Sequence, residues 1–415
     1  MRPLPALLAA LLLIAAAVVP VAGLTTTPDR VESVETTMPS ITTINNTTNQ
    51  LAIPDAEVRN ATYSVAGVDV GTAVQTGSTQ LHHRQETLAF QQRFQRTDSN
   101  GELSRLLDDR LSAVEREQVA LDARQDTAMS QYAAGEISAA EFLRMRMVVN
   151  AEAAELLDSL AGIESAPDSK PDYALSRDLT ARLRSVEGEL RTLTGPVGAQ
   201  LQSETTGAGE QNTVYIEASP TGYMLATIDG GEYVRETRLD DERDPTLPDQ
   251  FLAAARNDSD VDRFNPADDR AEELYPWLYE RQRPSFTYYG TSGIYELTAS
   301  HPNGQLTSYV DAGTTNVFYE EQTRELGGIE TTGSETRVNG TTRVTLQRTV
   351  ETGPLFVSVS NNVTSEPVDA NVSVDGQAIG ATGSDGFLWT VEPSSDYTVN
   401  VTTADTVTRV TVADA

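Results

Sequence analysis

The sequence contains no cysteine, a single lysine and only three histidines among its 415 residues. Without cysteine there is no disulfide bond, no thiol nucleophile, no iron–sulfur cluster and no cysteine-based zinc site. The sequence also lacks the Gly-x-Ser-x-Gly motif of serine hydrolases, a phosphate-binding glycine loop and a dinucleotide-binding fingerprint. These absences exclude cysteine chemistry and leave no recognisable motif of a serine hydrolase, a phosphate-binding loop or a dinucleotide-binding enzyme.

Positive charge is scarce as well, since 61 acidic residues face 30 basic ones and the formal net charge is −31. A nucleic-acid-binding protein needs a cationic face that displaces counterions from phosphates, so that class is excluded. The hydrophobic fraction of 39% is high enough for a packed core. At about 150 residues per domain, the length predicts two or three domains.

Lys170 is the only lysine, so the remaining 29 of the 30 basic residues are arginines. A large acidic excess with almost no lysine is typical of proteins that stay soluble in concentrated salt, where carboxylates bind water and their repulsion is screened. The alternative, an acidic secreted protein from an ordinary habitat, normally retains more lysine. The composition resembles that of secreted proteins of haloarchaea, which implies an extracellular or cell-surface location.

The N-terminus predicts export. Arg2 is followed by an apolar run from Leu4 to Val19 and then by small residues, which is the pattern of a signal peptide over residues 1–23 cleaved after Gly23. The alternative is an uncleaved membrane anchor, because about 20 apolar residues can span a bilayer. No second hydrophobic stretch approaches that length, so contact with a membrane is expected only here.

Eight Asn-x-Ser/Thr sequons are candidate glycosylation sites in an exported chain. They lie at Asn45, Asn46, Asn60, Asn257, Asn339, Asn362, Asn371 and Asn400. Residues 24–79, which are rich in Thr and Asn, are expected to form a solvated spacer with one or two short strands near Thr62–Val74.

Residues 80–200 are predicted to form an elongated antiparallel helical bundle or coiled coil. Apolar residues recur there every three or four positions, which places one apolar seam along each helix. The seams consist of Leu103, Leu107, Leu111, Val114 and Leu121, then Phe142, Met145, Val149, Ala153, Leu156, Leu160 and Ile163, then Leu175, Leu179, Leu183, Val186, Leu190 and Leu193. Ser138 and Glu141 form a capping box that starts one helix, and Gly195-Pro196 is expected to end the last one.

After a linker over residues 201–211, residues 212–335 are predicted to form an α+β domain. Strands are expected at Thr213–Ser219, Tyr223–Ile228, Glu232–Arg238, Ser285–Tyr289, Ile294–Ala299, Leu306–Asp311 and Asn316–Glu320, with a helix near Ala267–Arg281. These elements without a regular β-α-β alternation indicate an α+β fold. Residues 272–320, with a helix followed by hairpins and the motif Thr307-Ser-Tyr-Val-Asp311, resemble PepSY-type domains. The resemblance implies a module that regulates a peptidase.

Residues 336–415 are expected to be a β-rich region ending in an Ig-like β-sandwich. Asn339-Gly340 predicts a type I′ hairpin turn, and Asp375-Gly376 and Asp385-Gly386 predict two more turns. The stretch from Pro367 to Gly386, followed by Tyr397-Thr-Val399, resembles the carboxypeptidase regulatory-like sandwich. That resemblance implies an accessory, non-catalytic module.

Candidate site residues are few. His82 and His83 are expected at an exposed helix start, and His301 lies in a predicted Pro-Asn-Gly turn. Asp258, Asp260, Asp262 and Asp269 match positions 1, 3, 5 and 12 of a calcium loop, so calcium is the one candidate ion. Position 6 is Arg263 instead of glycine, and the alternative is an acidic surface loop adapted to salt. No catalytic residue and no other cofactor is predicted.

These observations predict an exported, non-enzymatic structural or interaction protein of the cell surface or envelope, with a protein or envelope component as its partner. The alternative is a binding module that regulates an exported peptidase through the PepSY-like residues. A hydrolase with an unrecognised carboxylate site is the third and less favoured hypothesis, since paired carboxylates are uninformative in a chain where nearly every loop offers such a pair.

Overall fold

The fold is described from a computed structural model. It describes residues 41–42, 49–65, 67, 70–205, 212–257, 262, 264–280, 283–301 and 304–413, all within the compact unit Pro39–Ala415. The predicted signal peptide and part of the predicted spacer, together with Asn45, Asn46, Asp258 and Asp260, lie outside the described residues.

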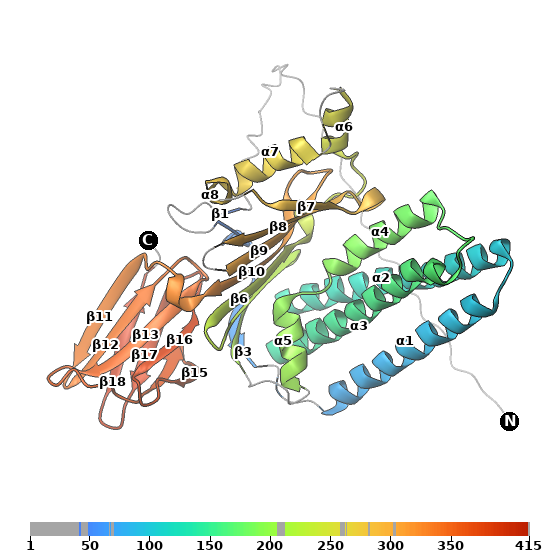
Figure 1. The fold of residues 1–415 in the computed structure, drawn as a ribbon. Helices are drawn as coiled ribbons and strands as arrows, with labels where there is room; N and C mark the ends of the chain where they lie inside the picture. Colours follow the sequence, from blue (N-terminus) through green and yellow to red (C-terminus); the bar gives the residue numbers. More distant parts are fainter. Residues whose placement is uncertain are drawn as a thin grey trace, which may run out of the picture. The chain divides into compact units, whose positions relative to one another are not determined.

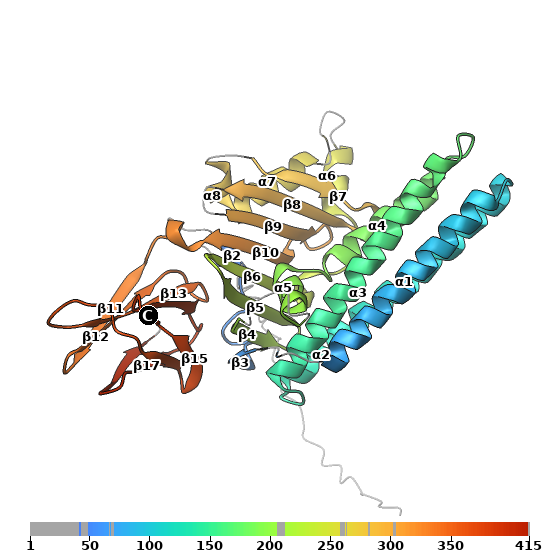
Figure 2. The ribbon, with the colours of Figure 1, turned by 60° about the horizontal axis from the view of Figure 1, so that its bottom comes forward.

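Helices occupy the N-terminal half of the described chain and β-sheets the C-terminal half (Figure 1). The helices are α1 (Val70–Arg96), α2 (Asn100–Ala133), α3 (Ala139–Ser165), α4 (Arg177–Arg191) and α5 (Pro196–Thr205), with the 3-10 helix η1 (Ala166–Ser169) after α3. Figure 2 shows α1, α2 and α3 side by side. Most of the predicted seam residues meet in one cluster that runs from Phe90 in α1 to Leu193 after α4, whereas Phe142 and Met145 pack in the cluster that the helices share with the sheet. The apolar periodicity therefore identified buried residues of α2, α3 and α4.

Two helix boundaries differ from the expectation. The first helix begins at Val70 instead of near residue 80, so the region Thr62–Val74, where short strands were expected, is a strand only as far as Ser64 and is helical from Val70. Pro196 begins α5, whereas Gly195-Pro196 was expected to end the last helix. Proline suits the first position of a helix, where its missing N–H has no partner to lose. The predicted capping box of Ser138 and Glu141 is present at the start of α3.

A single antiparallel sheet of eight strands forms the centre of the fold. Its order is β3 (Asn60–Ser64), β4 (Val214–Ser219), β5 (Gly222–Asp229), β6 (Glu232–Leu239), β10 (Val317–Glu325), β9 (Gly304–Asp311), β8 (Ile294–His301) and β7 (Ser285–Tyr288). The strands of the predicted α+β region lie close to their expected positions. Their union with β3, which comes from before the helices, was not expected.

Helices cover both faces of this sheet. On one face, α2, α3 and α5 share a core with the alternating strand residues Ile216, Tyr223 and Leu225. The other face packs against α7 (Phe264–Leu274) and α8 (Pro276–Tyr279), while α6 (Gln250–Asn257) contributes Phe251. The short 3-10 helices η3 (Gly290–Ser292) and η4 (Leu326–Gly328) connect strands, and η2 (Asp240–Glu242) lies between β6 and α6. A two-stranded sheet, β1 (Ile41–Thr42) with β2 (Gln50–Leu51), lies on this second face.

The C-terminal residues form a β-sandwich, as predicted. One sheet has the order β11 (Gly333–Asn339), β12 (Thr342–Arg348), β13 (Pro354–Asn361) and β16 (Phe387–Val391), and the other β15 (Gln377–Ala381), β14 (Asn371–Val374), β17 (Tyr397–Thr402) and β18 (Val407–Val412). Valines from both sheets form its core.

Two hairpin turns of the sandwich test the turn chemistry. Asp375 and Gly376 have φ of 49° and 84°, which is the conformation that an Asp-Gly type I′ turn needs. The turn between β11 and β12 consists of Gly340 and Thr341 rather than Asn339 and Gly340, because Asn339 already pairs with Thr342. A type II′ turn has glycine at its first central position. Gly340 therefore correctly indicated a tight turn, but the predicted turn was displaced by one residue along the chain.

Among the described residues, no helix is long and apolar enough to cross a membrane.

Candidate functional site

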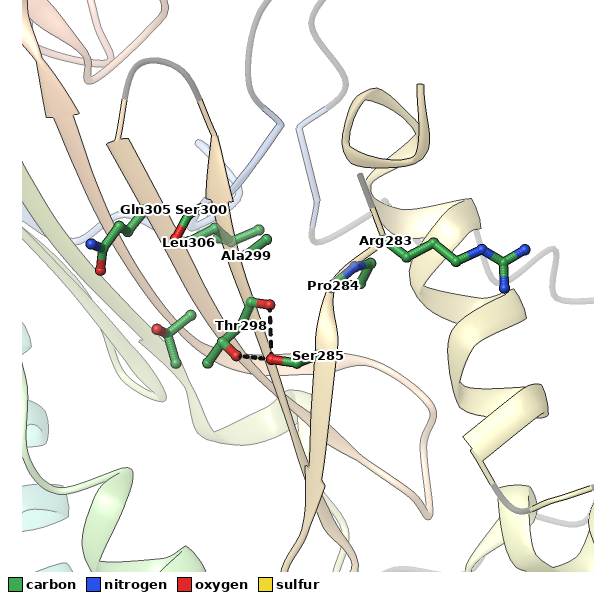
Figure 3. Close-up of a pocket in the computed structure, with 9 residues that line it drawn as sticks. Arg283, Pro284, Ser285, Thr298, Ala299, Ser300, Gln305 and Leu306 are labelled. Carbon is green, nitrogen blue, oxygen red and sulfur yellow. Dashed lines mark hydrogen bonds between the residues drawn. The ribbon is translucent and has the colours of Figure 1, made fainter. Parts of the chain in front are cut away.

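The cavity drawn in Figure 3 is a hollow of about 280 Å³ at the end of strands β7, β8 and β9. Ser285 bonds to the Thr298 hydroxyl across 2.5 Å, and among the described residues of the lining Arg283 is the one ionisable group. Arg283 itself pairs with Asp268 at 3.0 Å. A serine nucleophile needs an adjacent general base, and the lining of this cavity offers none.

No histidine is among the described lining residues of that cavity, and His82 and His83 are neighbours in α1 with ring centroids 6.1 Å apart. His82 and His83 are in the middle of α1, not at its start, because the helix begins earlier than expected. His82 contacts Glu86 at 3.2 Å, while His83 is buried against α2 and lies 3.7 Å from Glu117. His301 packs edge-on against Trp277, with ring centroids 5.1 Å apart.

The predicted calcium loop is only partly described. Asp262 precedes α7 and Asp269 lies on its exposed side, so the second half of the loop is helical. Within the described part of the chain, no group of three or more His, Asp or Glu residues is placed to hold a metal ion. The calcium site at Asp258, Asp260, Asp262 and Asp269 therefore stays a prediction.

The described sequons lie on strands, on turns or at the end of α6. Asn371 is exposed, and Asn339 is exposed at the end of β11, where its amide donates to the Val407 carbonyl at 3.0 Å. Asn362 accepts hydrogen bonds from Arg343, and Asn400 accepts one from Arg409. Asn60 in β3 donates to the Tyr132 carbonyl at 3.3 Å, and Asn257 is the last residue of α6. Asn339 and Asn371 are thus the most accessible of these acceptors.

The main concentration of buried charge lies on strands β6 and β10 at the centre of the sheet. Successive strand residues point to opposite faces, so Glu236 and Arg238 face α2, α3 and α5, whereas Arg235 and Glu320 face α7 and α8. All four are at most 3% exposed. The sequence does not single them out, because charged residues in so acidic a chain usually lie on the surface. One sequence signal could have revealed them: charged residues occur at successive positions, and therefore on both faces, of a strand in the middle of a predicted sheet.

On the helical face, Arg146 of α3 pairs with Glu236 at 2.9 Å and donates to Gln125. The other Glu236 oxygen accepts the backbone N–H groups of Val197, at 3.1 Å, and Gly198, at 3.4 Å. These groups open α5, where the helix dipole favours a negative charge. This network joins α3, α5 and β6 in the interior.

On the opposite face, Glu320 is the centre of a second network. It accepts the Tyr275 hydroxyl at 2.5 Å and the Gln322 amide at 2.8 Å, and lies 3.5 Å from Arg235. Arg324 continues the network by donating to Gln322 at 2.6 Å. The chain segment at Asn49–Leu51 contacts all four polar strand residues of this network.

The electrostatics of both networks follow from burial. Burial raises the pKa of Glu320, although Arg235 opposes the shift. Burial also lowers the pKa of Arg324 to about 10. For Glu321, burial and then the charge of Glu236 on the neighbouring strand raise the pKa from 4.5 to about 8. Perturbed pKa values often mark functional sites, but here each group lies within the packed sheet rather than in a cavity.

Comparison with known families assigns most of this architecture. Residues 1–211, just over half of the 415-residue chain, match the family described as a domain of unknown function, DUF7096. The chain belongs to this family. Residues 214–330 match the family of unknown function DUF7094, and residues 333–410 match the archaeal fibronectin-III type-like domain.

The comparisons refine two resemblances. The C-terminal sandwich is confirmed, and its match is to the archaeal fibronectin-III type-like family instead of the carboxypeptidase regulatory-like family. The residues that resemble PepSY domains fall within the DUF7094 match. Neither the curated proteins nor the solved structures contain a match to this chain. The fibronectin-III-like domain is consistent with an archaeal protein and compatible with a location at the cell surface.

Proposed function

We propose that the chain is an exported, non-enzymatic structural or interaction protein of the cell envelope, adapted to high salt. The observation that carries the proposal is the use of the buried charges: Arg146, Glu236, Arg235 and Glu320 bind one another or neighbouring backbone inside the sheet. None of them faces the described cavity, whose lining lacks a nucleophile with its base. The arrangement therefore suits a scaffold more than a catalyst.

The architecture supports an extended role for the helices. Helix α2 has 34 residues, which is about 50 Å at 1.5 Å per residue, and α1 and α3 have 27 each. We propose that these helices form an elongated bundle that presents surface beyond the sheet, and that the fibronectin-III-like domain is an adhesive or spacing module. This role needs no cofactor.

Export is proposed from the N-terminal residues and the sequons. N-terminal sequencing of the native protein is expected to give Leu24 as the first residue. An intact Met1 in the membrane fraction would show an uncleaved anchor instead.

The experiment that tests the role is a pull-down from envelope extract at molar salt with the full chain as bait. We expect recovery of an envelope protein, a surface polysaccharide or a second copy of the chain. Recovery of one dominant exported peptidase would favour the regulatory alternative. Hydrolysis of an envelope polymer by the purified chain would overturn the non-enzymatic proposal.

A further inference from the structure

Residues Asn49–Ile53, called the strap here, lie across the face of the sheet that packs against α7 and α8. The strap includes β2, which pairs with β1 through Ile41 with Leu51 and Thr42 with Gln50. Leu51 is fully buried and Ile53 is 4% exposed, and both pack into the core of this face. A segment from the N-terminal end of the described chain thus fills a groove formed by strands more than 180 residues away in sequence.

The sheet holds the strap by its main chain. Glu320 accepts the Leu51 N–H at 2.9 Å, Arg235 donates to the Leu51 carbonyl at 2.5 Å, and Gln322 donates to the Asn49 carbonyl at 2.9 Å. A carboxylate and a guanidinium therefore bind the backbone N–H and the backbone carbonyl oxygen of the same residue, Leu51. Main-chain hydrogen bonds with a pocket for an alternate side chain are the usual means of recognising an extended peptide.

The side chains of the strap add selectivity. Arg324 donates to the Gln50 side-chain oxygen at 3.3 Å, and the Gln50 amide donates to the Glu351 carbonyl at 2.7 Å beside the sandwich. The Asn49 amide donates to the Leu274 carbonyl at 3.1 Å at the end of α7. The groove thus selects an amide side chain followed by a buried aliphatic one.

The groove residues also hold one another without the strap. Glu320 keeps Tyr275, Gln322 and Arg235, and Gln322 also accepts from Arg324. After departure of the strap, Arg235 would keep its ion pair with Glu320 and Arg324 its hydrogen bond to Gln322, so these side chains would stay arranged for another peptide. Preorganisation of this kind reduces the cost of binding.

We propose that this groove is a peptide-binding site and that its partner is the strap of a second copy of this chain, exchanged for its own. The strap sequence fits the groove, as the contacts within one chain show. If two chains exchange their straps, the same contacts form twice within a symmetric dimer. The exchange would carry β1 along with the strap, and residues 54–59, which link the strap to β3, would rearrange. The inference deepens the proposed interaction role and rests on it by naming one partner.

The absence of cysteine allows a direct test with the full chain. In a Leu51→Cys chain the only thiol lies in the strap, and in a Leu225→Cys control it lies at an equally buried position of β5 in the same sheet. We expect a thiol reagent such as DTNB to modify the Leu51→Cys chain at least about tenfold faster, because release of the strap needs only local opening.

Addition of a competitor then tests the site itself. A synthetic peptide of residues 47–55, at about 1 mM to approach the effective concentration of a tethered segment, is expected to increase labelling of the Leu51→Cys chain. The same peptide with Asp in place of Leu51 is the control and should have no effect. Unlabelled wild-type chain should act like the first peptide and form a mixed dimer detected by sedimentation.

Three results would overturn the inference. Equal labelling of the two cysteine chains would show that the strap opens only with the whole fold. Labelling that the peptide does not change would show that the groove binds no peptide in trans. A response to the peptide but not to the wild-type chain would exclude the second copy as the partner. Each result leaves the envelope role to be decided by its own pull-down.

Discussion

Gly195 lies where the end of α4, the start of α5 and the sheet come closest. Its N–H donates to the Asn150 side-chain oxygen at 2.9 Å, and its carbonyl accepts the Ala199 N–H as α5 begins. A Cβ atom at this position would overlap the Glu236 carboxylate and the Tyr319 hydroxyl. Only glycine fits at this position, because there is no room for a side chain. The Gly195-Pro196 motif, interpreted as a helix end, did not reveal this packing.

Gly195→Ala is expected to destabilise the fold by about 1–3 kcal/mol, the usual cost of overpacking a tight interior. Gly77→Ala in α1 is the matched control, because a Cβ there meets nothing within 4 Å. The control is expected to gain up to about 1 kcal/mol from helix propensity. Thermal denaturation at high salt measures both, and equal effects of the two variants would contradict the packing argument.

Glu321 gives the fold a pH dependence at the scale of one residue. It lies directly opposite Glu236 on the neighbouring strand, and its pKa of about 8 keeps it protonated at pH 7. In the unfolded chain the pKa returns to its ordinary value near 4.5, so the folded state binds more protons between these two values. The contribution of Glu321 to the free energy of unfolding is therefore fully present below about pH 4.5 and is lost as the pH rises through 8.

A Glu321→Gln chain is expected to be less sensitive to pH than wild type and more stable at pH 8.5, by on the order of 2 kcal/mol, since the amide stays neutral. Thermal denaturation from pH 5 to 8.5 at constant salt measures this difference. Glu325→Gln, at the exposed end of the same strand, should follow the wild-type profile. Parallel curves for wild type and Glu321→Gln would show that this carboxyl is ionised in the fold.

At the scale of elements, the sequence predicted the helices and strands well where an apolar period reaches the core. Leu107, Leu156 and Leu183 each belong to a series of apolar residues spaced three or four positions apart along a helix. All three are buried in the shared cluster. The period says nothing about which element packs beside another. The eight-stranded order, the place of β3 beside β4 and the shared core of α2, α3 and α5 with the sheet depend on pairing between distant residues.

The candidate site was less predictable than the fold. Arg146 lies on α3 beside the apolar seam, where an arginine is usually solvated. Its burial depends on Glu236, 90 residues later in the chain. A single sequence does not show this pairing, because each partner alone is an ordinary surface residue in so charged a chain.

Arg146→Met is expected to cost about 3–5 kcal/mol, because Glu236 then remains as a buried charge without its cation. The double variant Arg146→Met with Glu236→Gln is expected to recover part of this loss, which a double-mutant cycle from thermal denaturation measures. Arg124→Met is the control, since Arg124 pairs with Glu152 at the partly exposed surface of α2 and α3. It should cost at most about 1 kcal/mol. A similar cost for both single variants would mean that the pair with Glu236 is solvated.

At the scale of the whole molecule, the net charge of −31 is the dominant property. Repulsion between exposed carboxylates extends over about 10 Å at 0.1 M salt but only about 3 Å at 1 M. The buried pairs such as Arg146 with Glu236 are screened far less, so salt acts mainly on the surface.

The fold is therefore expected to lose structure as salt is removed. Circular dichroism from 3 M to 0.05 M NaCl should show a cooperative loss of helical signal at the low end. A titration with sucrose at low salt is the control, because sucrose favours burial without screening charge. Full retention of the spectrum at low salt would contradict adaptation to high salt.

The bonds made by residues 49–64 also determine when folding can finish. Leu51 bonds to Glu320, 269 positions later, and the Tyr63 hydroxyl donates to the Val391 carbonyl, 328 positions later. Contacts of such sequence separation form late, because the closure entropy of the long intervening loop must be met first. A ribosome adding residues in order makes β4, the partner of β3, about halfway through the chain, but the bonds of Leu51 and Tyr63 wait for Glu320 and Val391. In the proposed export, a chain whose last bonds are still open would pass a translocation pore and close after its C-terminal sandwich has emerged.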